Sequence, residues 1–504
     1  MVTGNRVRSN IAANLAGRSI STFLAILFTP IYIKLLGIDA YGLVGFYITL
    51  QAALAFLELG LGRSCTRELA RLSGRVGNRQ YILDTLRSME YVYWIFSILI
   101  GFALSFSSDW IGHHWLSSKK FTPSDLGAII GMMGWVVALR WPIGLYVGAL
   151  TGLQRQVPLY GLNIFLAILS WGGACIVLLE VSATIQAFFL WQLFVALASV
   201  VSYFFLAWHY MPGSPLSGRF SLDLWKRILP FSSGVAVNAI LGTVLMQSDK
   251  LILSAVFPLK EFAYYSLASM MANAITMLAT PVSSAVFPKI SQMISMSQPG
   301  DKISGFYHLS CQAVSFITFP VALLFVFFPY EILLLYTGSS DIAANAAMIL
   351  SVLMIAKTMH ASMLVPYALQ LAYGWVRFSV YVNIITVLLY IPIILILVHV
   401  YGLLGGALAW LCVVGGYVFI ASPLMHKILL PGEWWSWFCR DILVTAVMVS
   451  LVLALFKMLL VFPVNTFWQI VFLICAGIIS YVIAILVNTR VRVWIHGFYS
   501  GKYA

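Results

Sequence analysis

Apolar runs of about 20 residues recur along the whole of this 504-residue chain, and they constrain its fold more than any other feature. A helix of that length crosses a hydrocarbon core about 30 Å thick. Because no water bonds to the backbone inside such a core, each run satisfies its own amide groups best as a helix. The chain is 62% hydrophobic and 9% charged, whereas a soluble protein carries about 25% charged residues. We therefore predict an all-α integral membrane protein with about 14 transmembrane helices.

The order of the predicted helices repeats in the two halves of the chain, which indicates an internal duplication. Helices four and ten, for example, each hold one basic residue near mid-membrane. A stretch rich in proline and glycine, residues 209–227, separates the halves as a linker. We predict two six-helix lobes around a central cavity, at residues 1–220 and 221–430. A third region, residues 431–504, holds two further helices and a cytoplasmic tail.

The basic residues predict the orientation of the chain in the membrane. The sequence holds 29 Lys and Arg against 16 Asp and Glu, a net charge of +13. Most of the basic residues fall in loops and tails on one side of the predicted spans, as they do in cytoplasmic segments. We therefore predict that both termini are cytoplasmic. In a soluble protein +13 would suggest nucleic acid, but here we expect no nucleic-acid partner.

The loop after helix two is the most basic one. Five of its arginines follow a four-residue spacing and would form one charged stripe on a helix: Arg63, Arg67, Arg71, Arg75 and Arg79. Such a stripe suits an anionic inner leaflet. A topology anchor and a role in gathering an anionic substrate both remain open.

The first predicted span, from Asn10 to Leu36, carries a charge well inside it at Arg18. Asn14 and Thr22 lie four residues to either side, so the three side chains share one polar stripe of a helix. A guanidinium that faces acyl chains is costly, and one at this depth usually faces a bundle interior or a watery cavity. We predict that Arg18 lines a cavity. Snorkelling to the cytoplasmic surface, or a structural ion pair, is the alternative.

Helices four and ten hold further ionisable groups near mid-membrane. Arg140 is followed by Pro142, which removes a backbone hydrogen bond and is expected to kink the helix. Lys357 holds the corresponding place in helix ten, and His360 lies three residues further along on the same face. We predict that Arg140 and Lys357 line the cavity. His360 either lines it too or is a packed polar residue.

Three more ionisable residues fall within predicted spans. Asp249 and Lys250 are adjacent in helix seven, so their side chains diverge by about 100° and are not expected to simply neutralise each other. Either could be an ion or proton site, and hydrogen bonding to a neighbouring helix is the alternative. Glu58 in helix two lies at nearly the same depth as Arg18. An ion pair between these two residues would either form a gate or only hold the two helices together.

The charges inside the predicted spans favour an anionic cargo. Among the residues deep within these spans, four bases outnumber two acids: Arg18, Arg140, Lys250 and Lys357 against Glu58 and Asp249. Arginine clasps a phosphate or diphosphate through two parallel hydrogen bonds. The sequence contains no HExxH or CxxC metal motif, no glycine-rich phosphate loop and no catalytic constellation. We therefore predict a secondary transporter that is not an enzyme and has neither a metal site nor an organic cofactor.

Short motifs mark the start of each half. The first half opens with Pro30-x-Tyr32-x-x-x-Leu36-Gly37-x-x-x-Tyr41-Gly42 and then LELGLG at residues 57–62, directly before the basic loop. The second half opens with SDKLIL at residues 248–253, followed by Tyr264 and by VFPK at residues 286–289. Together these motifs resemble the Wzx-like polysaccharide and oligosaccharide flippase family, of the multidrug/oligosaccharidyl-lipid/polysaccharide exporter superfamily.

The resemblance implies a multi-pass protein of the bacterial inner membrane. Such a flippase turns an undecaprenyl-diphosphate-linked oligosaccharide, an O-antigen or other surface polysaccharide repeat unit, from the cytoplasmic to the periplasmic leaflet by alternating access. Cationic cavity residues would bind the headgroup, by position Arg18, Arg140, Lys250 and Lys357. Gating or coupling to an H⁺ gradient, a Na⁺ gradient or the membrane potential would fall to Glu58, Asp249 and His360. A polysaccharide polymerase or glycosyltransferase complex is a possible partner besides the lipid bilayer.

The last two predicted spans lie outside the duplication. Some members of the superfamily with fourteen spans use this pair to form a groove for the lipid tail, and the resemblance carries that role to residues 441–488. Trp434, Trp435 and Trp437 precede the pair and are typical of an interfacial aromatic anchor.

Other functions fit parts of the sequence. A peptidoglycan lipid-precursor flippase of the same superfamily would also need a cationic lumen. A non-transporting scaffold of a glycan-assembly complex would use the buried charges only for helix packing. A drug or cation antiporter is disfavoured because the first span holds a base where such proteins often carry a carboxylate. The short periplasmic loops disfavour an integral glycan polymerase or ligase.

Overall fold

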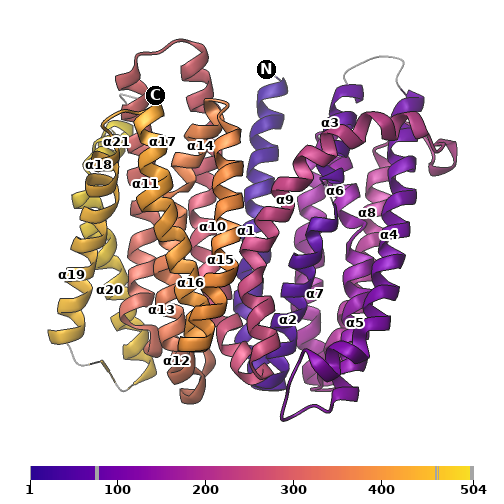
Figure 1. Cartoon of the computed structure of the whole chain (residues 1–504), viewed down its shortest axis with the longest axis horizontal. Coiled ribbons are helices and arrows are strands. Elements are labelled where there is room, and N and C mark those ends of the chain that lie inside the picture. The colour runs from indigo at the N-terminus through magenta and orange to yellow at the C-terminus, as the bar shows by residue number, and fades with distance from the viewer. Residues whose placement is uncertain (1, 59, 74–78, 460–461, 464, 500–504) are drawn as a thin grey trace. The chain divides into compact units, whose positions relative to one another are not determined.

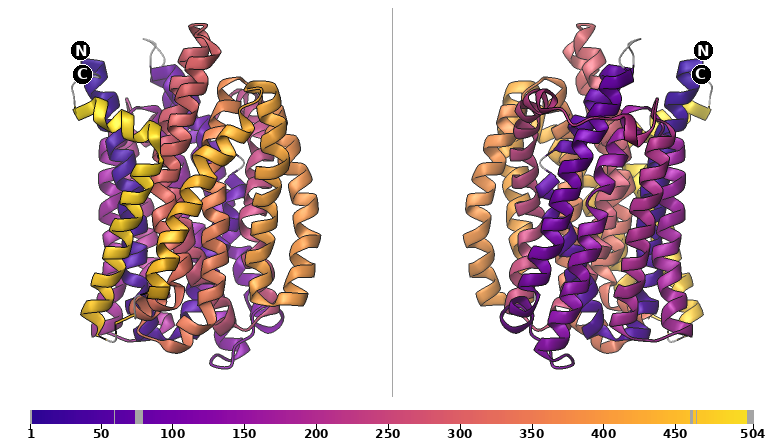
Figure 2. Two further views of the ribbon diagram at one scale, coloured as in Figure 1. Left: turned by 90° about the vertical axis from the view of Figure 1, so that its left-hand side faces the viewer. Right: turned by 90° about the vertical axis from the view of Figure 1, so that its right-hand side faces the viewer.

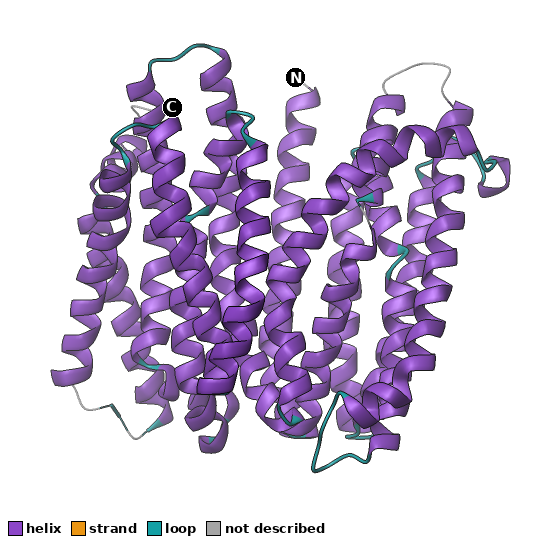
Figure 3. Cartoon of the chain, viewed as in Figure 1, coloured by secondary structure: helices purple, strands orange, loops and turns teal. Residues whose placement is uncertain are grey.

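The computed structural model describes residues 2–58, 60–73, 79–459, 462–463 and 465–499. Side chains are described throughout these ranges except at residues 2–16, 18–19, 73, 226–239 and 495–499. Helices account for 89% of the structure and the described residues form no strand (Figure 3). The prediction of an all-α fold is confirmed. The chain forms two compact units, Met1–Ala263 and Tyr264–Ala504.

The first unit is a bundle of long helices in which α4, α5, α8, α7 and α1 follow one another as packed neighbours (Figure 1). Its elements are α1 (Val2–Leu36), α2 (Ile38–Leu54), the 3₁₀ turn η1 (Ala55–Glu58), α3 (Leu61–Ser73), α4 (Arg79–His114), α5 (Pro123–Arg140), α6 (Ile143–Gly152), α7 (Gln156–Glu180), α8 (Ile185–His209), the 3₁₀ turn η2 (Pro215–Ser217) and α9 (Leu222–Val256).

The second unit is helical as well, and α10 (Leu259–Ser295) leads into it. The elements after α10 are α11 (Gly300–Phe327), α12 (Pro329–Thr337), α13 (Ser340–Ser362), α14 (Leu364–Ala372), α15 (Val376–Tyr401), α16 (Leu403–Gly416), the π-helical turn η3 (Tyr417–Ala421), α17 (Ser422–Leu429), α18 (Trp434–Ser436), the π-helical turn η4 (Trp437–Leu443), α19 (Val444–Leu459), α20 (Thr466–Val487) and α21 (Thr489–Tyr499). Figure 2 shows the yellow helices α19 and α20 side by side, and both pack against α11.

The helices have the length and composition of membrane spans. Among the described residues, twelve helical segments are long and apolar enough to cross a bilayer, and Ile20–Leu36 of α1 adds a shorter apolar stretch. Large apolar side chains on these helices point outward, as at Phe106, which is 94% exposed. Outward apolar surface of this kind is stable in lipid and not in water. The structure is therefore that of a multi-pass helical membrane protein.

Helix four is interrupted where the sequence predicts it. The helix α5 ends at Arg140 and α6 begins at Ile143, with Pro142 between them. Proline lacks the amide hydrogen that an uninterrupted helix would need at this point. In the second unit α13 and α14 are separated in the same way at Met363, three residues before Pro366. Each break lies just after one of the predicted mid-membrane ionisable residues.

The basic loop after helix two is helical, as the arginine spacing suggests. In α3 the side chains of Arg63, Arg67 and Arg71 are exposed, and Arg71 forms an ion pair of 2.8 Å with Glu68 one turn earlier. The opposite face of α3 is buried. Arg75 lies outside the described residues, so the stripe is described for its first three members and for the exposed Arg79 at the start of α4.

The tryptophan segment before the last two spans does not form the simple surface anchor that the sequence suggests. Trp435 is exposed, but Trp437 is completely buried and its ring lies 5.3 Å from that of His426. Trp434 stacks on Phe438 at 5.7 Å. The prediction was wrong for Trp437, because its side chain packs inside the second unit.

Candidate functional site

In the first unit, Glu58 sits at the end of the turn η1 in a space made by two glycines. Its Oε1 accepts a hydrogen bond of 3.1 Å from the Tyr93 hydroxyl of α4. A Cβ added at Gly144 would lie 2.8 Å from this oxygen, and one added at Gly62 would be closer still. Side chains at these two positions would occupy the place of the carboxylate. The Glu58 carboxylate can therefore keep this position between α3 and α6 only because residues 62 and 144 are both glycine.

Arg140 lies close by, at the end of α5, and is held by uncharged groups. Its Nη2 donates a 2.8 Å hydrogen bond to Oε1 of Gln192 in α8 and contacts Oγ of Ser170 in α7 at 3.4 Å. The guanidinium carbon also lies 5.9 Å from the ring centre of Tyr47 in α2. Among the residues with described side chains, no carboxylate forms an ion pair with Arg140. The guanidinium is therefore held by the neutral acceptors of Gln192 and Ser170, and no acid among these contacts neutralises its charge.

Arg140 and Glu58 line one small pocket, which we call the first-unit pocket. Its volume is about 160 Å³, and its walls come from η1, α2, α5 and the start of α6: Gln51, Leu54, Ala55, Glu58, Val137, Arg140, Trp141 and Gly144. A water molecule takes about 30 Å³ of liquid volume, so the pocket has room for several waters or a small polar group. The Arg140 guanidinium and the Glu58 carboxyl group therefore line the same pocket. The predicted pair of Glu58 with Arg18 stays a prediction, since the Arg18 side chain lies outside the described residues although its backbone belongs to α1.

In the second unit, Lys357 and His360 both face Trp410. The Lys357 ammonium of α13 lies 4.1 Å from the Trp410 ring centre, a cation–π contact, and the lysine is buried. The His360 ring packs edge-on against the same indole of α16, at 6.4 Å. Tyr390 of α15 contacts Trp410 from another side at 6.0 Å. An indole face stabilises a desolvated cation by up to about 2 kcal/mol, so the contact with Trp410 offsets part of the cost of burying the Lys357 ammonium.

Asp249 and Lys250 lie near one another in α9, contrary to the expectation that adjacent residues would diverge. Nζ of Lys250 is 3.9 Å from Oδ1 of Asp249, and it also donates a long 3.4 Å hydrogen bond to the Met246 carbonyl. Asp249 is buried, whereas Lys250 is half-buried. The flexible lysine side chain folds back along the helix, which the angular argument did not consider. The pair is loose, because its separation is at the outer limit of an ion pair.

The sequence-based analysis missed the residues that position these charges. Gln192 and Ser170 hold Arg140, Tyr93 holds Glu58, and Trp410 holds Lys357. Gln192 had a usable signal, because an amide within the apolar span Ile185–His209 needs a polar partner. Tyr93 and Trp410 had no comparable signal in the sequence, since tryptophan and tyrosine are common throughout this chain.

Two units of membrane-spanning helices, each with a broken helix that carries a basic residue near the break, define a polytopic membrane protein of the secondary-transporter type. Solved structures share this fold. The inward-closed lipid II flippase MurJ matches with a TM-score of 0.71 at 15% sequence identity, over 93% of this chain and 97% of that one. An inward-facing multidrug resistance MATE family transporter of the MOP superfamily matches with a TM-score of 0.64 at 15% identity, over 82% and 99% of the two chains.

The chain belongs to the polysaccharide biosynthesis protein family, whose profile matches residues 7–294. A Shigella flexneri protein named "Putative O-antigen transporter" is 24% identical over 405 residues, which cover 80% of this chain and 93% of that protein. The resemblance to Wzx-like flippases is confirmed. These relatives are transporters and flippases and not catalytic enzymes, in agreement with the prediction of a secondary transporter.

Proposed function

We propose that this protein is a flippase of the bacterial inner membrane. It would carry an undecaprenyl-diphosphate-linked oligosaccharide from the cytoplasmic to the periplasmic leaflet, with both termini cytoplasmic. The observation that carries the proposal is Arg140, a guanidinium that lines a pocket and bonds only to neutral groups among the described side chains. A diphosphate offers such a cation the bidentate acceptor geometry that it binds best. The family and the O-antigen relative support a lipid-linked glycan as the cargo.

The physical obstacle that such a protein removes is the burial of the glycan. Each sugar hydroxyl costs several kcal/mol to place in hydrocarbon without a hydrogen-bond partner, so unaided flipping is extremely slow. Polar side chains in a hydrated cavity replace the lost water. An inside-negative potential then favours outward movement of the diphosphate by about 2.3 kcal/mol per charge per 100 mV.

The second cation would act in the same way from the other unit. Lys357 lies against the Trp410 face, in the last two turns of α13 before its break at Met363. In this proposal Arg140 and Lys357 bind the headgroup in turn as the lobes, residues 1–220 and 221–430, alternate between inward- and outward-open states. Arg18 and Lys250 would add to the positive path, and Glu58, Asp249 and His360 would gate it or couple it to H⁺ or Na⁺.

The lipid tail needs an apolar path beside the polar one. A shallow groove of about 380 Å³ runs along α20, with Leu324 and Gly477 among its lining residues, and its walls are almost entirely apolar. This groove lies within the region 431–504 and against α11. We propose that it holds the first isoprene units of the undecaprenyl chain while the headgroup is inside the cavity.

The proposal is tested by transbilayer movement of a fluorescent undecaprenyl-diphosphate oligosaccharide in proteoliposomes. We compare the wild type with the double variant Arg140→Ala, Lys357→Ala. The matched control replaces two exposed bases, Arg155→Ala and Lys302→Ala. We expect the wild type and the control to flip the lipid and the cavity variant to lose most of this activity. Full activity in the cavity variant would reject the cationic path.

Two further arms of the same assay separate the alternatives. A peptidoglycan lipid precursor presented in place of the oligosaccharide tests the related flippase function. No flipping of either lipid by folded wild-type protein would favour a scaffold of a glycan-assembly complex. Unchanged flipping after both the H⁺ and Na⁺ gradients are collapsed would remove ion coupling from the proposal.

A further inference from the structure

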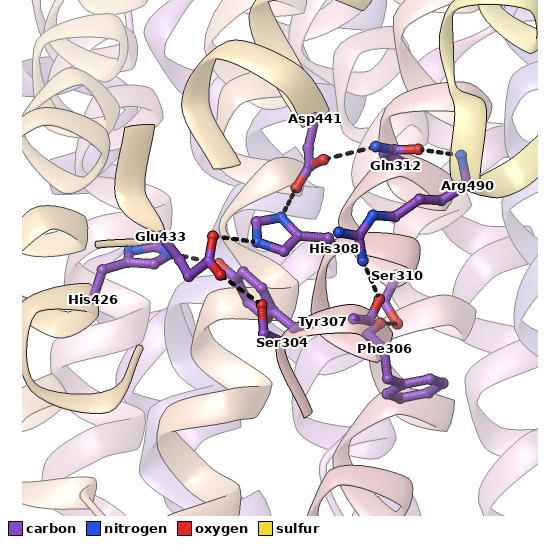
Figure 4. A network of polar contacts seen from close by, with 11 residues as sticks. Ser304, Phe306, Tyr307, His308, Ser310, Gln312, His426, Glu433, Asp441 and Arg490 are labelled. Atoms are coloured by element: carbon purple, nitrogen blue, oxygen red, sulfur yellow. Dashed lines mark hydrogen bonds and ion pairs between the residues drawn. The ribbon is translucent and has the colours of Figure 1, made fainter. Parts of the chain in front are cut away.

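A second buried polar cluster lies in the second unit, and none of its members is among the residues assigned above to the transport path (Figure 4). At its centre is His308, which lies eight residues into α11 and is 1% exposed. One carboxylate reaches it from the turn η4 and another from the segment that precedes α18. These two acids are Asp441 and Glu433. The cluster thus joins α11 to the chain that leads into the last two membrane spans.

The two ring nitrogens of His308 each face a carboxylate oxygen. Nδ1 lies 2.5 Å from Oδ2 of Asp441, and Nε2 lies 3.1 Å from Oε2 of Glu433. An ionised carboxylate only accepts hydrogen bonds, and a neutral imidazole donates from one nitrogen alone. Two hydrogen bonds therefore require two protons shared among the three groups. The arrangement is either an imidazolium between two carboxylates or its isomer with one carboxylic acid.

The surroundings favour this protonated state. Gln312 donates a 2.9 Å hydrogen bond to the other Asp441 oxygen and accepts one of 3.0 Å from the Arg490 backbone amide. The Arg490 guanidinium donates a 2.9 Å hydrogen bond to the Gly305 carbonyl and lies on the same side of the cluster as Gln312 (Figure 4). With Arg490 and an imidazolium, the two carboxylates are balanced and the cluster is neutral overall. Loss of one proton would leave it with a net negative charge in a largely buried site, which is costly.

The other titratable groups around His308 do not supply the proton. His426 of α17 has its Nδ1 at 2.8 Å from the Ser422 carbonyl, so that nitrogen donates. Its Nε2 lies 2.8 Å from the Tyr307 hydroxyl. Both ring nitrogens of His426 therefore have hydrogen-bond partners other than His308, Asp441 and Glu433. Cys311, one turn after Tyr307, is buried among the same helices.

The two carboxylates differ in their access to water. Asp441 is 1% exposed, whereas the Glu433 side chain is 34% exposed and has a second hydrogen bond, 2.9 Å from Ser304 Oγ. Glu433 follows Gly432, whose φ of 84° is a turn conformation that few other residues adopt. A proton that leaves the cluster can thus pass to solvent along Glu433. The bond that weakens is then the one between Glu433 and the imidazole.

We propose that His308, Asp441 and Glu433 form a proton-binding site that fastens the segment before the last two spans to α11. With the proton bound, Glu433 is held by His308. When the proton leaves, His308 keeps one N–H for Asp441, and its second nitrogen presents a lone pair to the Glu433 carboxylate. Two acceptors then face each other, and the turn at residues 430–433 opens. This inference does not depend on the proposed flippase function, because it concerns protonation and local opening only.

The test is amide hydrogen exchange of the full-length protein, followed by mass spectrometry on peptides that cover residues 430–443. Exchange is measured between about pH 6 and about pH 9, the interval around histidine titration, and is corrected for the intrinsic pH dependence of exchange. If opening releases one proton, the opening equilibrium rises by up to about tenfold per pH unit once the opened site has lost its proton. The rise levels off at the pH where the closed site loses the proton as well. Residual protection that changes less than about twofold over the whole interval contradicts the proposal.

Two variants separate a proton site from a static structural contact. In Glu433→Gln the new amide donates to the free lone pair of a neutral His308, so the contact survives without the additional proton. We expect this variant to stay protected at high pH, where the wild type opens. The control His399→Gln changes an exposed histidine at the end of α15 and should titrate like the wild type. If Glu433→Gln follows the same pH curve as the wild type, the cluster is not the site that releases the proton.

Discussion

Replacing Arg140 by Gln removes the guanidinium from the first-unit pocket and leaves its supporting residues paired. Ser170 Oγ donates a 2.8 Å hydrogen bond to Gln192 Oε1, and Gln192 Nε2 donates one of 3.2 Å to the Ser170 carbonyl. Neither neighbour is stranded when Arg140 is lost. We therefore expect the variant to fold, with a loss of about 1 kcal/mol in the free energy of unfolding for the missing hydrogen bond.

The expected loss of substrate binding is larger. A hydrogen bond to a charged group contributes about 1.5 to 3 kcal/mol, and each 1.4 kcal/mol is a factor of ten in affinity. Arg140→Gln should therefore weaken binding of a diphosphate headgroup about ten- to a hundredfold. Arg140→Lys keeps the charge but loses the planar fork, so it should fall between the wild type and the Gln variant.

The assay is the initial flipping rate in proteoliposomes at subsaturating lipid-linked oligosaccharide, with thermal unfolding in parallel. Arg155→Gln serves as the control, because Arg155 is an exposed base of the same unit that lies over the ring of Tyr210 at 4.7 Å. A wild-type rate for Arg140→Gln would refute the assignment of Arg140 to the substrate path. A loss of stability well above 1 kcal/mol, with binding unchanged, would make Arg140 a structural residue.

Two further predictions concern the carboxylates. In Gly144→Ala the three atoms nearest the new methyl group all belong to the Glu58 side chain, so the flexible carboxylate should move and lose its hydrogen bond from Tyr93. The variant should lose about 1 kcal/mol in the free energy of unfolding, measured by thermal unfolding. Gly161→Ala, which has open space around its Cβ, should lose no stability, and equal effects of the two substitutions would reject the placement of Glu58 by the two glycines. Burial alone would raise the pKa of Glu433, but its hydrogen bonds from a serine and a histidine outweigh burial and lower that pKa below the ordinary value. While the cluster holds its proton, the ionised group therefore stabilises the fold above its unfolded pKa of about 4.3, and this contribution is lost as the pH falls through the lowered folded pKa. Thermal unfolding of wild type and Glu433→Gln should converge in acid, and a constant difference would contradict the linkage.

Local properties of the chain were enough to predict the class of fold. The length of each apolar run requires a membrane helix whatever its neighbours are, and Pro142 interrupts its helix because of its own missing amide hydrogen. The motifs around residues 30–62 and 248–289 pointed to the family to which the chain belongs. A deep base such as Arg140 was recognisable as well, because a charge within an apolar run needs a partner or water wherever the run packs.

The partners of those charges depend on helix packing and were not predictable from spacing. Gln192 is 52 residues from Arg140, and Asp441 is 133 residues from His308. Nothing in either local sequence specifies these pairs, since each results from the rotation of two helices about their axes. Trp437 shows the same limit, because it was expected at the surface and is completely buried against His426. Side-chain direction within a packed bundle is set by contacts between distant segments, and that is why the charge-bearing positions could be found in the sequence while their geometry could not.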